Sequence, residues 1–256
     1  MKINRRQFVR NLGLGTASLS MGSLISTSSC APSGDSRDKR GKVSDDDQFL
    51  FIGDDIAIAQ TEYGKVQGYL LNHVYTFLGV PYGADTSGKN RFMPPQKPEP
   101  WTDVRPAVFY GNTAPQRMEN RWPNNYGTFA DHWNYWDVSE DCLYLNVWTP
   151  GIADGKKRPV LVWLHGGGFT NGSGIEQDGY HGENISREGD IVFCSINHRL
   201  GPIGFSDLSG VGGEAYKDSG NVGMLDIIAA LRWVHDNIAN FGGDPGNVTV
   251  MGQSGG

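Results

Sequence analysis

The stretch that decides the fold is Asn247-Val248-Thr249-Val250-Met251-Gly252-Gln253-Ser254-Gly255-Gly256. Its first half predicts a short buried strand. Its second half matches the pattern G-x-S-x-G, in which a Ser occupies a sharp turn from strand to helix. The chain can fold back this tightly only with small residues two positions before and after the Ser. Such a turn presents the Ser254 hydroxyl to solvent, where a His can take its proton.

The residues before this strand predict a helix and a tight turn. Apolar residues recur with helical spacing between Asn221 and Phe241. Gly242-Gly243 then supplies a stop, and Asp244-Pro245-Gly246 is typical of a turn. Helix, turn and strand joined by such short connections indicate the βαβ organisation of an α/β fold.

Further upstream, three apolar runs predict strands. Two of them, at 159–164 and 190–196, are continuous rather than alternating, which is typical of strands buried on both faces of a mostly parallel sheet. The third is expected at 143–148. Shorter strands with turns are predicted within 56–80, whereas 81–136 is rich in Pro and aromatic residues and is typical of surface wrapping.

A Gly-rich loop, His165-Gly166-Gly167-Gly168-Phe169, directly follows the strand predicted at 159–164. Three consecutive Gly residues let backbone N–H groups converge on one point with no side chain in the way. An oxyanion hole requires fixed donors of this kind, because they face the place where negative charge develops. In a chain with 36 Gly the G-x-S-x-G pattern alone is weak evidence, and this second motif strengthens it. A flexible Gly turn is the alternative interpretation of the loop.

With these two motifs, further segments give the chain a resemblance to the type B carboxylesterases, a family that includes bacterial para-nitrobenzyl esterases and the cholinesterases. The segments occur in the family's order and are 77–82, 91–95, 140–147, 165–169, 197–201, 230–234 and 240–249. The resemblance implies an α/β-hydrolase fold, with a mostly parallel sheet and helices on both faces.

The same resemblance implies a chemistry. Ser254 would be the nucleophile, and the N–H groups of Gly167, Gly168 and Gly255 would be the oxyanion donors. Ser254 would attack the carbonyl of a small-molecule ester, an alcohol would leave, and water would hydrolyse the acyl-enzyme. No metal or organic cofactor is implied. Two other functions stay open: a non-catalytic binding or scaffold protein of this fold, and a serine hydrolase that acts on thioesters or amides.

Several residues depart from the family pattern. Gln253 stands where Glu is usual, which removes one negative charge beside the site. Cys142 usually pairs with an upstream Cys, but Ala114 stands at that position, so a free thiol is expected. His198 replaces a usual Tyr and is expected to be structural, and His165 is expected to prop the Gly-rich loop.

Two buried ion pairs are further implications of the resemblance. They join Arg91 with Glu140 and Arg199 with Asp226, and would act as structural clamps. The alternative is that each of these charges is simply solvated.

The expected mechanism also needs a His base and a carboxylate, which follow the Ser in the chain order of this fold. All six His residues precede Ser254, and none stands at the family's base position. Residues 49–256 are therefore expected to be the N-terminal part of a carboxylesterase domain, truncated after the turn that carries Ser254. By itself this chain is expected to be inactive.

Residues 1–30 predict an export signal, because a basic start is followed by a weakly apolar stretch and small residues. The run at 4–9, with Arg5-Arg6, resembles the twin-arginine signal. Cys30 resembles the lipid-modified Cys of bacterial lipoproteins, although Thr27 stands where an aliphatic residue is usual. A buried amphipathic helix is the alternative, but its Ser and Thr residues would face a core. Residues 31–48 predict a polar linker. The expected location is the bacterial periplasm, or the membrane through a lipid anchor at Cys30.

Composition excludes several classes of protein. The net charge is −6, which does not suit a nucleic-acid-binding protein. Seven Trp, 11 Phe and 10 Tyr supply the core that a disordered acidic chain lacks. No apolar run reaches the roughly 18 uncharged residues of a membrane-spanning helix. Three Cys residues cannot form a disulfide scaffold.

Overall fold

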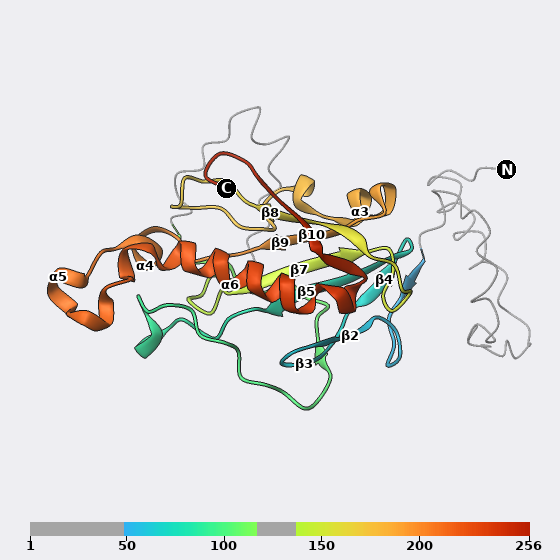
Figure 1. Cartoon of the computed structure of the whole chain (residues 1–256), viewed down its shortest axis with the longest axis horizontal. Helices are drawn as coiled ribbons and strands as arrows, with labels where there is room; N and C mark the ends of the chain where they lie inside the picture. The colour runs from blue at the N-terminus through green and yellow to red at the C-terminus, as the bar shows by residue number, and fades with distance from the viewer. Residues whose placement is uncertain (1–48, 117–136) are drawn as a thin grey trace, which may run out of the picture. The chain divides into compact units, whose positions relative to one another are not determined.

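The computed structural model describes residues 49–116 and 137–256 (Figure 1). The predicted export signal, the predicted linker and part of the predicted surface wrapping lie outside the described residues. In this part of the chain the strands are β1 (Leu50–Phe51), β2 (Ile58–Thr61), β3 (Gly64–Gln67), β4 (Tyr69–Leu71), β5 (Val74–Pro81), β6 (Arg105–Pro106), β7 (Tyr144–Thr149), β8 (Arg158–Leu164), β9 (Val192–Ile196) and β10 (Gly243–Gly252). The α-helices are α3 (Glu183–Gly189), α4 (Gly201–Phe205), α5 (Ser209–Gly212) and α6 (Val222–Asn237).

Seven of the described strands form one sheet in the order β1-β4-β5-β7-β9-β8-β10, and β2, β3 and β6 form a smaller one. In the large sheet β8 pairs parallel with both β9 and β10. The remaining pairs, from β1 through β4, β5 and β7 to β9, are antiparallel. Within the described residues the sheet is therefore mixed, and its parallel pairs lie on the β10 side. The reason is connection length: two residues join β4 to β5, and so short a link can only make a hairpin, whereas helices lead into β9 and β10.

Helices cover both faces of the large sheet, as expected. On one face Trp233 and Val234 of α6 share a buried apolar cluster with Cys194 of β9, and α6 runs along the strands in Figure 1. On the other face the hydroxyl of Ser186 in α3 donates to the backbone oxygen of Trp148 in β7, at 3.1 Å. Because neighbouring side chains in a strand point to opposite faces, the continuous apolar runs fill both clusters.

The observed helix and last strand lie close to their predicted ranges. The helix predicted up to Phe241 is α6 followed by one 3-10 turn, and Gly242 ends it at a φ of +79°. The turn predicted at 244–246 falls inside β10, where the pairing with β8 shifts its register between Gly243 and Val248. The N–H of Gly246 donates to the Asp244 carboxylate there, at 2.9 Å, as in a local turn.

The expectation that the last strand is buried needs correction for the described residues. In this part of the chain β10 lies at the edge of the sheet and pairs only with β8. Two of its apolar side chains, Val250 and Met251, are 47% and 52% exposed. An edge strand keeps one row of backbone groups and much of its side-chain surface open.

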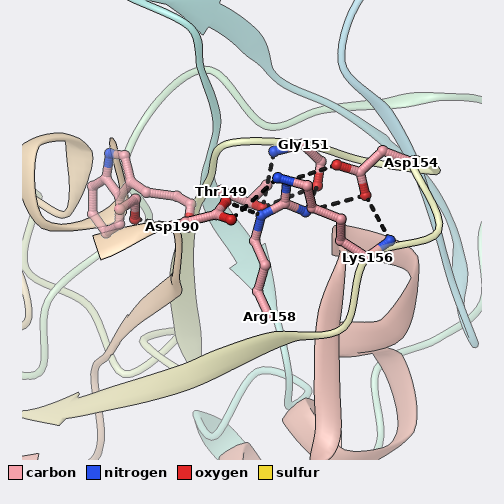
Figure 2. Close-up of polar contacts among 8 residues, drawn as sticks. Thr149, Gly151, Asp154, Lys156, Arg158 and Asp190 are labelled. Carbon is pink, nitrogen blue, oxygen red and sulfur yellow. Dashed lines mark hydrogen bonds and ion pairs between the residues drawn. The ribbon is translucent and has the colours of Figure 1, made fainter. Parts of the chain in front are cut away.

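A buried Arg holds the amino ends of the three parallel strands together (Figure 2). Arg158 begins β8, and its side chain is 3% exposed. Its guanidinium donates to both oxygens of Asp154, at 2.6 and 3.1 Å, and to Asp190 before β9, at 2.7 Å. Its backbone N–H donates to Gly242, just before β10, at 3.1 Å. These contacts tie together the starts of β8, β9 and β10.

One of the two predicted ion clamps is confirmed as a buried pair. The guanidinium and backbone N–H of Arg199 make three hydrogen bonds to Asp226 of α6, at 2.7 to 3.0 Å, with both side chains at most 1% exposed. Arg91 and Glu140 also pair, through two bonds of 2.6 Å, but the Arg91 side chain is 48% exposed. The expectation of burial is wrong for that pair, which lies at the surface.

Candidate active site

Ser254 lies in a sharp turn directly after β10. Its φ is +56°, a left-handed conformation that costs a non-Gly residue about 1–2 kcal/mol. The N–H of Gly256 donates to the carbonyl oxygen of Gln253 at 3.0 Å, which closes the turn around Ser254. The Ser254 side chain is exposed. The geometry is that of the strained, solvent-facing Ser that the G-x-S-x-G pattern predicts.

The two flanking glycines are required by close backbone approaches. A Cβ added to Gly252 would collide with the backbone of Gly256 on the other side of the turn. A Cβ added to Gly256 would collide with the carbonyl oxygen of Leu164 and lie 2.8 Å from that of His165. Both contacts are with backbone, which cannot move aside as the end of a side chain can, so neither position has room for a larger residue.

The Gly-rich loop leaves the carboxyl end of β8 and turns at once. Gly167 and Gly168 have φ values of +104° and +60°, and the N–H of Thr170 donates back to the carbonyl oxygen of Gly167 at 3.1 Å. A Cβ on Gly167 would collide with the carbonyl oxygen of Asn171. Within the described residues no hydrogen bond uses the N–H of Gly167, Gly168 or Gly255, so these donors are available to a bound oxygen atom.

The parallel pairing of β8 with β10 brings the two motifs together. Leu164 lies opposite Gly252 at the ends of these strands. Beyond them, a Cβ on Gly255 would lie only 2.9 Å from the backbone nitrogen of Gly168, so the two turns are in contact. The structure therefore brings the turn of Ser254 and Gly255 into contact with the loop of Gly167 and Gly168 beyond the carboxyl ends of parallel strands, where α/β proteins bind ligands. Their catalytic roles stay predictions.

Two histidine rings stack on each other, and one of them belongs to the first residue of the Gly-rich loop. His165 and His198 are buried and stack, with ring centroids 4.9 Å apart and planes 13° apart. Nδ1 of His165 lies 2.8 Å from the carbonyl oxygen of Gly166, and Nδ1 of His198 lies 2.9 Å from that of Arg199. Burial lowers the pKa of His198, which keeps that ring neutral at pH 7. The geometry fits the structural roles expected of both rings.

The structure also describes the surroundings of Gln253 and Cys142, two residues that depart from the family pattern. The side chain of Gln253 packs against Gly166, where an added Cβ would collide with its amide oxygen. Cys142 is a free, buried thiol, as expected, with Ala114 also buried. Burial raises the pKa of the Cys142 thiol well above its usual value, so the group stays protonated and unreactive.

The described residues supply only part of a catalytic site. Among them, no side chain makes a hydrogen bond to the Ser254 hydroxyl, and no group of three or more His, Cys, Asp or Glu residues is placed to hold a metal ion. None of the helices in this part of the chain is long and apolar enough to span a membrane. A cavity of about 380 Å³ lies elsewhere, between Tyr110, Asp178 and His181, and includes none of the four candidate residues.

One contact shortly after the Gly-rich loop has no signature in the sequence. The side-chain amide of Gln116 pairs with the backbone of Gly172: its oxygen accepts from the N–H at 2.8 Å, and its nitrogen donates to the carbonyl at 2.9 Å. The two residues are 56 positions apart, and Gln116 belongs to no local motif. Only the position of the chain in space reveals this contact.

Comparison with known proteins gives the fold and the family. The sequence pattern of the carboxylesterase family matches residues 55–256. A solved esterase of Clostridium hathewayi, described as able to hydrolyse aliphatic aromatic polyesters, has a TM-score of 0.75 and 43% identity, over 82% of this chain and 40% of that one. The chain is 46% identical over 199 residues to a phenmedipham hydrolase of Pseudarthrobacter oxydans, and 44% identical over 202 residues to a para-nitrobenzyl esterase of Bacillus subtilis.

These matches define the class of the protein as the α/β-hydrolase fold. The chain belongs to the carboxylesterase family. The matched part makes up 78% of this chain and 38% of each of the two curated relatives. The chain therefore spans well under half the length of the relatives it matches.

Proposed function

We propose that the complete protein hydrolyses carboxylic esters, with Ser254 as the nucleophile. The contact between the Ser254 turn and the Gly-rich loop is the observation that carries the proposal, because it sets a nucleophile beside unused N–H donors. Membership of the carboxylesterase family supports it. A general base removes the Ser254 proton, and the oxygen attacks the ester carbonyl.

The negative charge of the tetrahedral intermediate then forms next to the N–H groups of Gly167, Gly168 and Gly255. Removing one such donor costs about 3 kcal/mol of transition-state stabilisation in enzymes of this kind. The intermediate expels the alcohol, which takes the proton from the base, and leaves an acyl group on Ser254. Water repeats the sequence, so the products are an acid, an alcohol and the free hydroxyl.

Replacement of Ser254 tests the proposal directly. In the complete protein, Ser254→Ala should lower p-nitrophenyl acetate turnover by about 10⁴-fold or more. Ser209→Ala, which changes an exposed Ser of α5, should leave turnover unchanged. Unchanged turnover in Ser254→Ala would refute the assignment.

Covalent labelling separates an esterase from a non-catalytic scaffold. A fluorophosphonate probe bonds to an activated Ser and loses fluoride, so it should label the wild type and not Ser254→Ala. A folded protein that neither turns over esters nor takes the label would be a binding protein. Comparing p-nitrophenyl acetate with p-nitroacetanilide and an acetyl thioester would reveal a preference for amides or thioesters instead.

We also propose that the protein is exported through residues 1–30, with lipid attachment at Cys30 as the means of membrane anchoring. The basic start and the Arg5-Arg6 pair support export. Replacing both arginines by Lys should keep the protein in the cytoplasm, whereas Arg10→Lys should not. If Cys30 carries lipid, Cys30→Ala should move the protein from the membrane fraction to the soluble periplasm. Mass spectrometry of the N-terminal peptide checks the modification.

A further inference from the structure

Phe169, the residue after the Gly-rich triplet, combines two unfavourable features. Its φ is +64°, in the left-handed region where a bulky residue is a genuine outlier. Its side chain is also 38% exposed among the described residues. Gly would remove the strain at this position. A strained and exposed aromatic residue in a functional loop points to a role beyond packing.

The surroundings hold the ring in place on one side. Phe169 contacts Phe205 of α4, with ring centroids 5.4 Å apart and planes at 50°. The carbonyl oxygen of Phe169 accepts a hydrogen bond from the N–H of Gly201 at the start of α4, at 2.7 Å. Phe205 in turn packs on Gly223 of α6, where an added Cβ would lie 2.5 Å from its ring. The two rings are therefore anchored by α4 and α6 and do not form a loose loop tip.

The backbone of Phe169 also lies close to the turn that carries the candidate nucleophile. The backbone nitrogen of Phe169 is 3.5 Å from the position of a Cβ on Gly255, the residue after Ser254. We propose that Phe169 and Phe205 form an apolar wall that binds an alkyl or aryl group of the ester next to the scissile carbonyl. The wall carries no charge, so it favours substrates by the apolar area they bury against it. This inference rests on the proposed function and adds a substrate preference to it.

The test is a chain-length series on the complete protein. Wild type, Phe169→Gly and Phe205→Ala are compared on p-nitrophenyl acetate, butyrate and hexanoate, and on ethyl, butyl and benzyl acetates. Phe169→Gly removes the ring while keeping a residue that accepts the φ of +64°. Phe109→Ala is the matched control, since Phe109 is 69% exposed and lies outside the candidate site.

Phe169→Gly and Phe205→Ala should each prefer the larger substrates less than the wild type does. We expect this loss among the p-nitrophenyl esters, among the acetates, or in both series. The ratio of kcat/KM between large and small substrate should fall about tenfold, mainly through KM, while Phe109→Ala keeps the wild-type ratio. Turnover of the acetate shows in the same experiment that the ester chemistry is intact. If wild type and variants hydrolyse acetate and share the same ratios, the wall is refuted and the proposed function stands. If wild type releases no product from any ester, the proposed function fails instead.

Discussion

Gly252 lies opposite Leu164 at the carboxyl ends of the parallel strands β10 and β8. The residues that follow each strand then turn over the same end of the sheet. This register brings Gly255, three residues beyond Gly252, into contact with Gly168, four residues beyond Leu164. A shift of one residue in the pairing would carry one motif away from the other.

Gly167 and Gly168 of the Gly-rich loop should differ in how well they tolerate replacement by Ala. A Cβ on Gly167 would collide with the carbonyl oxygen of Asn171, whereas a Cβ on Gly168 meets no atom within 4 Å and adds only backbone strain. Gly167→Ala should therefore lower kcat/KM for p-nitrophenyl acetate by about 100-fold or more, the value of one oxyanion donor. Gly168→Ala should cost about tenfold, which corresponds to 1–2 kcal/mol of left-handed strain. Equal losses would contradict the geometry of the loop.

Breaking the buried pair of Arg199 and Asp226 should destabilise the protein strongly. Asp226→Ala leaves a guanidinium buried without its carboxylate, which costs about 3–5 kcal/mol of the free energy of unfolding. The matched control is Asp236→Ala on the same helix, whose carboxylate is 47% exposed and should change little. Denaturant titration of the complete protein measures both.

A double variant supplies the second check on that pair. Arg199→Met with Asp226→Leu removes both charges together and should recover most of the lost stability. If it is as unstable as Asp226→Ala, the loss comes from packing and not from the unpaired charge.

The contacts of Arg158 with Asp154 and Asp190 should make the free energy of unfolding fall at acidic pH. Hydrogen bonds from Arg158 hold the pKa of Asp154 and of Asp190 below their usual value in the folded state. Each carboxylate therefore contributes stability that is fully present above the unfolded pKa of about 3.9 and is lost as the pH falls through the lower folded pKa. Asp190→Asn should be less stable than wild type at pH 7, and the gap should close towards pH 2. Urea unfolding across this range measures it; a gap that widens at low pH would contradict the assignment.

The internal cysteines should resist thiol reagents in the folded protein. Cys142 and Cys194 are buried, and burial raises the pKa of both thiols, so little thiolate exists to react. Iodoacetamide should modify neither residue at pH 8 until the protein is unfolded, as peptide mass spectrometry would show. Rapid modification of Cys142 in the native protein would mean that the thiol is accessible.

The candidate site could be predicted from local sequence because its requirements are local. A strained Ser turn needs glycines at fixed offsets, and converging N–H groups need a run of glycines, so Ser254, Gly167, Gly168 and Gly255 stand out in the sequence. Burial of a strand on both faces is also visible in the strand's own residues, so the continuous apolar runs predicted β8 and β9. The antiparallel pairs between β1 and β9 could not be found in this way, because pairing depends on which strands meet after the chain folds.

The sequence by itself thus determined the two candidate motifs, the family, and the strands and helix that carry the motifs. The tertiary structure alone decided the contacts between distant segments: the pairing of Gln116 with Gly172, the stacking of His165 on His198, and the strained ring of Phe169 against Phe205. Each of these depends on backbone direction and on distance in space. Residue type and spacing along the chain encode neither, because many sequences with the same local pattern can bring different partners together.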